Sequence, residues 1–226
     1  MTRFYCPLPL ELNAVFALPA AAARHAQVLR LQPGDPIQLF DGLGGAWRGE
    51  VMSMGRQEVQ ARALALRDVQ ARPQQEVTLA VGMPANERMD WLVEKATELG
   101  VTRLVPLVTE RTVVRLQGER ASKRVAHWQA IAAGACEQSG RDVLPVIEAV
   151  QPLTTWLQTQ VRQDASFRMC LSLAPDAQDA ATLTLSRAQA WCAALGPEGG
   201  WSANEEVALQ RHGFRSEEHT SELQSH

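Results

Sequence analysis

The residues best suited to chemistry form one glycine-rich stretch, Leu195-Gly196-Pro197-Glu198-Gly199-Gly200-Trp201. Glycine adopts backbone conformations that a Cβ forbids, and it lets main-chain amides come close to a bound molecule. The short apolar run from Ala190 to Leu195 predicts a buried strand before this stretch. Ser202 and Glu205 have the spacing of a capping box, which predicts a helix N-terminus after it. The order of strand, glycine turn and helix suits a small-molecule site.

Spacing alone leaves the ligand of this turn open. The same layout suits a phosphate at a helix N-terminus, or the adenosine and amino-acid ends of a larger cofactor. It also suits no ligand, because a plain tight turn between a strand and a helix has the same residues. A transferase acting on a phosphate ligand ranks last, since the chain has neither a P-loop lysine nor a GxGxxG motif.

Two further polar segments carry candidate functional groups. Glu94 to Val101 is followed by Glu110 and Arg111, and Glu137-Gln138-Ser139-Gly140-Arg141 is followed by Pro145. Taken alone, a charged segment that ends in glycine is typical of a helix C-terminus with solvated neighbours. Both segments therefore need the rest of the chain to give them a role.

The elements around these motifs predict a mostly parallel α/β sheet, because strands and helices alternate from Val77 onward. Expected strands are Val77 to Val81, Val101 to Val108, Val143 to Val150, Phe167 to Leu173 and Ala190 to Leu195; expected helices run from an Asn86 N-cap to Gly100, around Trp128 to Ala135, and from Pro152 to Val161. In such sheets ligands bind beyond the carboxyl ends of the strands, which is where the glycine turn falls.

Residues 1 to about 70 favour a different architecture, a small β-barrel. Turn signals at Pro33 to Pro36 and at Asp41 to Gly45 separate short candidate strands, and Arg24 to Arg30 predicts a short helix. Arg72-Pro73-Gln74-Gln75 is polar and contains proline, so we place the domain boundary there.

Composition favours an intracellular protein and excludes several classes. No apolar run reaches the length of a membrane span and no signal peptide is evident, so the cytoplasm is expected. The cysteines lie far apart, which argues against a disulfide framework or a zinc site, and we expect no metal. The formal net charge is -3, yet twenty of the basic residues are arginine and only Lys95 and Lys123 are lysine. That bias suits RNA phosphate contact, and a GC-rich coding sequence equally well.

Together, the motifs resemble one known family. The stretch GPEGG followed by an apolar residue, Ser and acidic residues is similar to the cofactor loop of the ribosomal RNA small subunit methyltransferase E family, a group of knotted SPOUT methyltransferases. The resemblance recurs in both polar segments and near the N-terminus, where it includes Arg3-Phe4, His25, Val28, Arg30, Gly34 and Asp35. It covers about residues 3 to 214.

The resemblance implies a fold and an activity. The fold is a SPOUT-type parallel sheet with a trefoil knot in residues 73–214, preceded by a PUA-like RNA-binding β-barrel in residues 1–72. The activity is methyl transfer from S-adenosylmethionine to N3 of uracil 1498 in 16S ribosomal RNA. The target base must be unpaired or flipped. A homodimer is implied as well, and the substrate is either free RNA or the assembled small subunit.

The resemblance also implies roles for particular residues. The cofactor is expected to contact Leu173, Leu195, Gly196, Gly199, Gly200 and Trp201. RNA contacts are expected from Arg3, Arg24, His25, Arg30, Lys95 and Arg111. Catalytic candidates are Arg141, Glu198 and Glu137: Arg141 and Arg111 are expected to hold RNA phosphate or negative charge on uracil, while Glu198, Glu137 and also Glu98 are chemically possible proton acceptors. Each of these glutamates has a structural alternative, loop orientation for Glu198 and arginine pairing for the other two.

After Phe214 the resemblance stops. The family continues with a strand and a helix that close the knot and complete the cofactor pocket. Residues 215–226 contain one aliphatic residue and no periodicity, so we expect no buried strand there. We interpret them as a non-native or disordered tail, similar to a translated sequencing adapter. Weak or absent cofactor binding and an unstable catalytic domain would follow if the chain ends this way. The alternative function is a non-catalytic RNA-binding protein with a decayed methyltransferase domain.

Overall fold

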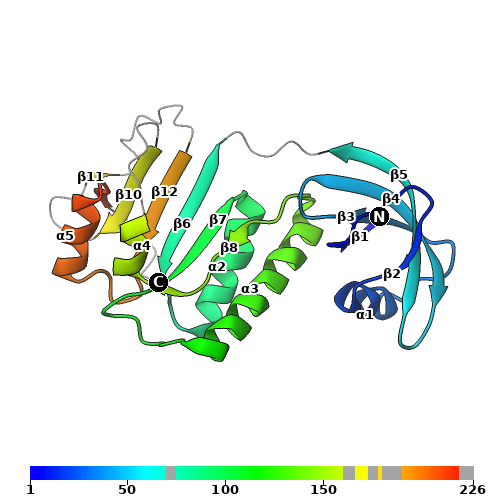
Figure 1. Ribbon diagram of the computed structural model, residues 1–226, viewed down its shortest axis with the longest axis horizontal. Helices are drawn as coiled ribbons and strands as arrows, with labels where there is room; N and C mark the ends of the chain where they lie inside the picture. Colours follow the sequence, from blue (N-terminus) through cyan, green and yellow to red (C-terminus); the bar gives the residue numbers. More distant parts are fainter. Residues whose placement is uncertain (70–74, 160–165, 173–177, 180–189, 219–226) are drawn as a thin grey trace, which may run out of the picture. The chain divides into compact units, whose positions relative to one another are not determined.

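The chain forms two compact units in the computed structural model, which describes residues 1–69, 75–159, 166–172, 178–179 and 190–218 (Figure 1). Unit 1 comprises Met1–Arg72 together with Ala130–Leu144, and unit 2 comprises Pro73–Gln129 together with Pro145–His226. Ala130–Leu144 therefore clusters with the N-terminal residues, although the sequence pattern assigned it to the second domain.

Unit 1 is built on one five-stranded sheet with strand order β1-β3-β4-β5-β2. Its strands are β1 (Thr2–Tyr5), β2 (Val15–Ala17), β3 (Pro36–Phe40), β4 (Gly45–Met54) and β5 (Val59–Val69). β1 pairs with β3 in parallel, and the other neighbours pair antiparallel. Helix α1 (Ala20–Val28) buries Ala22, Ala23 and Ala26 in the core of this unit, which includes Phe4 and Leu39.

The segment after Ser139 attaches to the N-terminal strands within unit 1. The Leu144 amide donates to the Gly42 carbonyl over 2.9 Å, and the Gly44 amide donates to the Asp142 carbonyl over 3.0 Å. The Arg3 guanidinium donates to the Asp142 carboxylate over 2.7 Å. These bonds explain why Ala130–Leu144 groups with unit 1.

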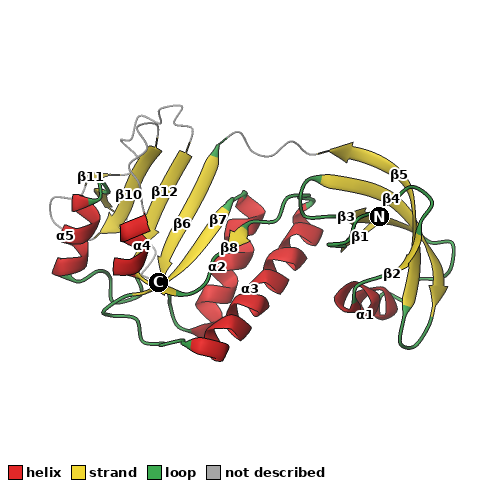
Figure 2. Cartoon of the chain, viewed as in Figure 1, coloured by secondary structure: helices red, strands yellow, loops and turns green. Residues whose placement is uncertain are grey.

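Unit 2 contains the parallel sheet that the alternating pattern predicts, with strand order β11-β13-β10-β12-β6-β7-β8 and β9 pairing with β7. Its strands are β6 (Glu76–Gly82), β7 (Arg103–Val108), β8 (Val146–Ile147), β9 (Gln151–Pro152), β10 (Ser166–Ser172), β11 (Gln178–Asp179), β12 (Ala190–Leu195) and β13 (Arg215–Glu218). Every strand pairing that the described residues make in this sheet is parallel. The arrows of β6, β10 and β12 accordingly point to the same edge in Figure 2.

The helices outside unit 1's core are α2 (Asn86–Leu99), α3 (Gly118–Ser139), α4 (Leu153–Thr159) and α5 (Ala203–Arg211). α2 ends as predicted at Gly100, whose φ of +97° is a left-handed conformation that favours glycine. Its N-cap is Ala85 and not Asn86, which is already the first helical residue. Where a single long strand was expected from Val143 to Val150, only Val146–Ile147 pairs with β7.

The interpretation of residues 215–226 as a disordered tail is wrong for Arg215–Glu218. These residues form β13, which lies in parallel between β10 and β11. The pattern failed because strand pairing uses main-chain groups and does not require apolar side chains. Arg215 places its guanidinium 5.6 Å from the centre of the Phe167 ring, and the Ser216 hydroxyl lies 3.7 Å from the Cys170 sulfur. His219–His226 lie outside the described residues, and the trefoil knot stays a prediction.

Candidate functional site

The glycine turn lies at the carboxyl edge of the sheet in unit 2, as the sequence predicts. Leu195, the last residue of β12, is in register with Leu171 of β10 and with Val81 of β6. The chain then turns sharply, because the Gly200 amide donates to the Pro197 carbonyl over 2.8 Å. Gly200 has a φ of +67°, which is strained for a residue with a Cβ. The turn therefore presents main chain, with little side-chain cover, beside three strand ends.

The capping box at the start of α5 is confirmed. The Glu205 amide donates to the Ser202 hydroxyl over 3.3 Å, and the Ser202 amide donates to Glu205 Oε2 over 2.9 Å. Glu205 is buried, and its Oε1 accepts a further bond of 2.8 Å from the Glu110 amide. One carboxylate thus connects the glycine turn to the loop that follows β7.

Arg111 makes a second connection between the same two loops. Its guanidinium donates to the Gly199 carbonyl over 2.7 Å. A Cβ on Gly199 would come within 3.4 Å of the Arg111 side chain, so the two residues are already in close contact. Arg111 was predicted to bind RNA. Within the described residues it holds the main chain of the glycine turn, and its exposed position leaves the RNA role a prediction.

Glu198 connects the turn to the loop that follows β6. Its Oε1 accepts from the Ala85 amide over 2.9 Å and from the Arg88 guanidinium over 3.2 Å. The Ala85 amide bond is the largest cause that lowers the pKa of Glu198 below its ordinary value, and the Arg88 charge adds to it. A carboxylate held in its ionised form by these donors is a weak proton acceptor. The geometry favours loop orientation over base catalysis.

Gly82 is a neighbour of the glycine turn that the sequence interpretation missed. A Cβ on this last residue of β6 would lie 2.6 Å from Pro197 Cδ and 2.9 Å from the Pro197 nitrogen. The glycine turn therefore packs directly against the Gly82 backbone. The available signal was a glycine at the end of a predicted strand, which indicates a close backbone approach.

Trp201 is a buried core residue, and its contact with the cofactor stays a prediction. Its side chain is part of the buried cluster that includes Trp156 and Phe214, and its indole nitrogen donates to the Leu171 carbonyl over 3.1 Å. Trp201 therefore anchors the end of the turn to β10. Leu195 is half-buried, and Leu173 lies outside the described residues.

Glu137 and Arg141 lie in unit 1, whereas Glu198 and the glycine turn lie in unit 2. Glu137 accepts from the Tyr5 amide over 2.9 Å and lies 3.4 Å from His25 Nδ1. The His25 ring meets the Phe4 ring edge-on. Both Glu137 and His25 thus have structural contacts in this unit.

Three predicted RNA ligands in unit 1 differ in exposure. Arg3 is largely buried: it donates to the Arg141 carbonyl and to Asp142, and its guanidinium lies 4.9 Å from the centre of the Phe40 ring. Arg24 and Arg30 are exposed. Only the two exposed arginines are placed as a phosphate contact requires.

Lys95 lies in unit 2 on α2 and pairs with neighbouring glutamates. Its ammonium group lies 2.7 Å from Glu94 and 3.0 Å from Glu98. The bond to Glu94 is the largest cause that raises the pKa of Lys95. Lys95 therefore carries two acidic neighbours that weaken its attraction for phosphate.

Three cysteine thiols are held in their protonated form by burial. Burial raises the pKa of Cys6, Cys136 and Cys192 to about 11, which keeps these thiols protonated and unreactive at neutral pH. Among the described residues, no group of three or more His, Cys, Asp or Glu side chains is arranged to hold a metal ion.

No helix in the described part of the chain is long and apolar enough to span a membrane.

We expect the Glu198→Gln variant to lower the melting temperature by a few degrees at pH 7. The pKa of Glu198 is lowered in the folded chain, so the ionised carboxylate stabilises the fold above its ordinary pKa of about 4.3, and this contribution disappears as the pH falls through the lowered pKa. Thermal melts of both proteins between pH 7 and pH 3 should therefore converge on the acid side. Glu76→Gln, an exposed glutamate in the same unit, should show no such convergence. A difference that persists unchanged at pH 3 contradicts this role.

Comparison with known proteins places this architecture in a class. A family model described as an RNA methyltransferase domain matches residues 71–217, and one described as an RNA methyltransferase PUA domain matches residues 18–64. The fold and site thus define an RNA methyltransferase domain joined to a PUA domain. The predicted fold class, a parallel α/β domain with an N-terminal PUA-like domain, is confirmed.

Individual relatives within this class of RNA methyltransferases share one name. Ribosomal RNA small subunit methyltransferase E of Synechocystis is 31% identical over 206 residues, which cover 90% of this chain and 66% of that protein. The protein of the same name from Mycobacterium tuberculosis is 30% identical over 210 residues, which cover 91% of this chain and 79% of the relative. The chain therefore spans about two thirds to four fifths of the length of these relatives.

Solved structures of related proteins have a similar fold. A ribosomal RNA small subunit methyltransferase E from Neisseria gonorrhoeae, bound to S-adenosylmethionine, superimposes with a TM-score of 0.88 at 33% identity, over 96% of this chain and 88% of that one. A Legionella pneumophila protein solved with the same cofactor also has a TM-score of 0.88, at 27% identity. The chain belongs to the ribosomal RNA small subunit methyltransferase E family. The family resemblance found in the motifs is confirmed.

Proposed function

We propose that this chain transfers a methyl group from S-adenosylmethionine to N3 of uridine 1498 in 16S ribosomal RNA. The observation that carries this proposal is the glycine turn, whose exposed main chain lies beside the ends of β6, β10 and β12. The Neisseria relative with this fold was solved with S-adenosylmethionine, and the relatives are named for methylation of small-subunit ribosomal RNA. The site, the fold and the family therefore support one activity.

The turn fits such a cofactor at Gly200, where nothing lies within 4 Å of the Cβ position. Gly196 instead lies against the main chain of Gly200 and Trp201, and Gly199 lies against the Arg111 side chain. Gly196, Gly199 and Gly200 would hold the adenosine and amino-acid ends, and the bound sulfonium would supply the methyl group. Leu195 would contribute apolar surface.

The turn's role in catalysis is to hold the cofactor in a fixed position. In a direct displacement, most of the rate gain comes from holding the reacting atoms in line at close distance. Glu198, Glu205 and Arg111 each bond the turn or its helix to a neighbouring loop. These three contacts therefore limit movement of the turn relative to the sheet edge. Uridine N3 must lose its proton, and no described contact assigns that proton to Glu198.

RNA binding by unit 1 is the second part of the proposal. Arg24 on α1 and Arg30 just after it are exposed and positively charged, so they can contact phosphates. We also propose that the chain acts as a homodimer on cytoplasmic 16S RNA, either free or in the small subunit. Size-exclusion chromatography with light scattering would test the dimer.

The deciding experiment is mass spectrometry of nucleosides. The chain is incubated with S-adenosylmethionine and either naked 16S RNA or small subunits that lack the modification. We expect 3-methyluridine in at least one substrate and none without the chain. RNA retention without 3-methyluridine, and without a calorimetric signal for S-adenosylmethionine, would support the alternative of a non-catalytic RNA-binding protein.

We expect the Arg141→Ala variant to reduce methylation by about tenfold while S-adenosylmethionine affinity stays within about twofold. The reason is that Arg141 is proposed to hold RNA phosphate or the negative charge on uracil. Its carbonyl already accepts from Arg3, and alanine preserves this main-chain bond. Calorimetry with cofactor and initial rates with RNA measure the two effects separately. Unchanged turnover would remove Arg141 from the site.

A further inference from the structure

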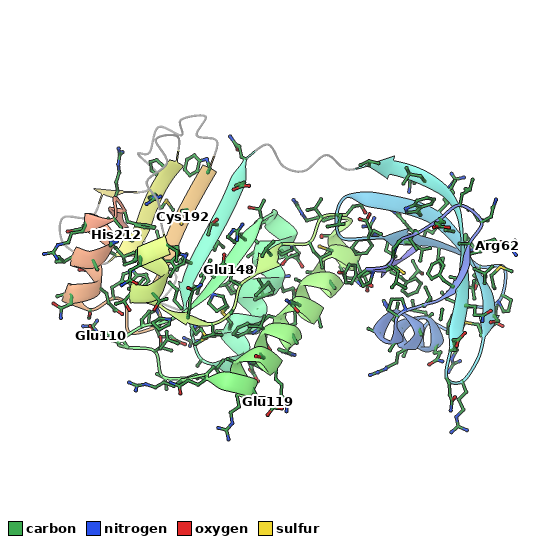
Figure 3. The ribbon with its side chains drawn as sticks, viewed as in Figure 1. Arg62, Glu110, Glu119, Glu148, Cys192 and His212 are labelled. Atoms are coloured by element: carbon green, nitrogen blue, oxygen red, sulfur yellow. The ribbon has the colours of Figure 1, made fainter. Side chains whose placement is uncertain are left out.

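A hollow of about 320 Å³ lies at the carboxyl ends of β7 and β9 in unit 2. Its lining begins at Val108, the last residue of β7, and includes Pro152, the last residue of β9. Glu110, labelled in Figure 3, stands on the loop that leaves β7 here. None of the described residues that line it comes from the turn Gly196–Gly200. The hollow is therefore a neighbour of the turn and not the turn itself.

The lining has two chemical sides. Leu116, Pro152 and Leu153 give an apolar wall, while Gln117 and Thr154 contribute an amide and a hydroxyl. An apolar surface with a few neutral hydrogen-bonding groups suits a flat heteroaromatic ring, whose faces are apolar and whose edge carries donors and acceptors. A purely apolar ligand would leave the amide and the hydroxyl without use.

The lining carries charges of both signs. Arg115 brings a guanidinium, the group that recognises phosphate oxygens in a bidentate manner, while Glu110 and Glu205 bring carboxylates. The Glu205 carboxylate already accepts from the Glu110 and Ser202 amides. Ligand pockets usually range from about 300 to 1,000 Å³, so the hollow is at the small end and fits a single nucleotide better than a dinucleotide. The apolar surface, the neutral hydrogen-bonding groups and the guanidinium match the base faces, the base edge and the phosphate of one nucleotide.

Glu205 connects this hollow to the glycine turn. It lines the hollow, and its carboxylate accepts from the Glu110 amide on one side and from the Ser202 amide on the other. A group bound in the hollow would therefore lie next to the helix start that follows the turn.

We propose that this hollow binds one unpaired nucleotide of the RNA substrate, with its base against Leu116 and Pro152, its base edge at Gln117 and Thr154, and its phosphate at Arg115. The proposal rests on the function proposed above. It assigns RNA recognition to unit 2, in addition to the exposed arginines of unit 1.

The test fills the hollow with a large side chain. Thr154 is exposed on the first turn of α4 and lines the hollow, whereas Thr155, its exposed neighbour, does not. Uridine 5′-monophosphate is the probe, observed by saturation-transfer NMR at saturating S-adenosylmethionine. We expect a signal with the wild type and with Thr155→Trp, and none with Thr154→Trp. The apparent KM for 16S RNA should rise about tenfold in Thr154→Trp only, with cofactor affinity unchanged.

Other outcomes would overturn the proposal. Equal probe signal and equal KM in both tryptophan variants would show that the hollow takes no nucleotide, and loss of cofactor affinity in Thr154→Trp would assign it to the cofactor. Gln117→Ala, outside any helix or strand, is the substitute if Thr154→Trp does not fold, and it should weaken the probe signal. Failure of the proposed function itself is separate, because it would appear as wild-type protein that makes no 3-methyluridine.

Discussion

The Gly82→Ala variant should bind S-adenosylmethionine about tenfold to 100-fold more weakly than the wild type, which is the affinity equivalent of a typical overpacking cost. A methyl group at this position would lie 2.6 Å from Pro197 Cδ, 2.9 Å from the Pro197 nitrogen and 3.1 Å from Thr109 Cγ2. Proline cannot move its Cδ by rotating a side chain, because the ring ties that atom to the backbone nitrogen. The end of β6 or the whole glycine turn must therefore shift.

A shift of the turn also strains its connections. The Glu198 carboxylate in the turn accepts from the Ala85 amide over 2.9 Å. The Gly199 carbonyl in the turn accepts from the Arg111 guanidinium over 2.7 Å. Overpacking of this kind typically costs about 1–3 kcal/mol of stability. Gly82→Ala should therefore lower both the free energy of unfolding, measured by urea titration, and the cofactor affinity, measured by calorimetry.

The matched control for Gly82→Ala is Gly134→Ala on α3. A Cβ at Gly134 would meet nothing within 4 Å, so alanine there should leave cofactor affinity unchanged. It should stabilise the helix by about 0.5–1 kcal/mol. Equal cofactor affinity in both variants would show that contact between β6 and the turn does not shape the site.

Local signals in the sequence predicted the centre of the site well. The strand Ala190–Leu195, the glycine turn and the Ser202–Glu205 capping box depend on neighbours within a few residues, so the pattern of types contains them. The alternation of strands and helices likewise predicted the parallel sheet. The pattern did not indicate which side chains would be engaged by long-range contacts in the folded protein.

Long-range contacts account for the missing information. Arg3 was expected at RNA, but its guanidinium binds Asp142, 139 residues away in sequence. The indole nitrogen of Trp201 donates to the carbonyl of Leu171, a contact that the residue types around Trp201 did not indicate. Such pairings follow from how strands are ordered in each sheet, and residue types alone do not specify that order.

The strand Arg215–Glu218 shows a second reason why sequence patterns miss structural elements. Hydrophobic periodicity detects a strand by the burial of its side chains. β13 is joined to its neighbours by main-chain pairing with β10 and β11, a contribution that leaves no trace in residue type. A polar sequence is therefore weak grounds for excluding a strand when an adjacent strand offers free main-chain groups.

The connections between loops suggest that the site depends on one buried carboxylate more than on any exposed charge. Glu205 Oε1 accepts from the Glu110 amide over 2.8 Å, and Oε2 accepts from the Ser202 amide over 2.9 Å. Glu205 is only 7% exposed, so water cannot easily replace either bond. Both loops lose their common acceptor if this side chain changes.

The Glu205→Gln variant should lose about 2 kcal/mol of stability and lower kcat/KM by about tenfold to 100-fold. Glutamine keeps one acceptor oxygen, so its amide nitrogen must face the second buried N–H, which then has no acceptor. Glu206→Gln is the matched control: it removes the same charge one residue away, and its oxygen can still accept from the Ser172 hydroxyl, now 2.6 Å from the carboxylate. Urea titration and methylation rates of both variants give the comparison. If Glu206→Gln loses as much as Glu205→Gln, the effect belongs to helix charge and not to the connection between the loops.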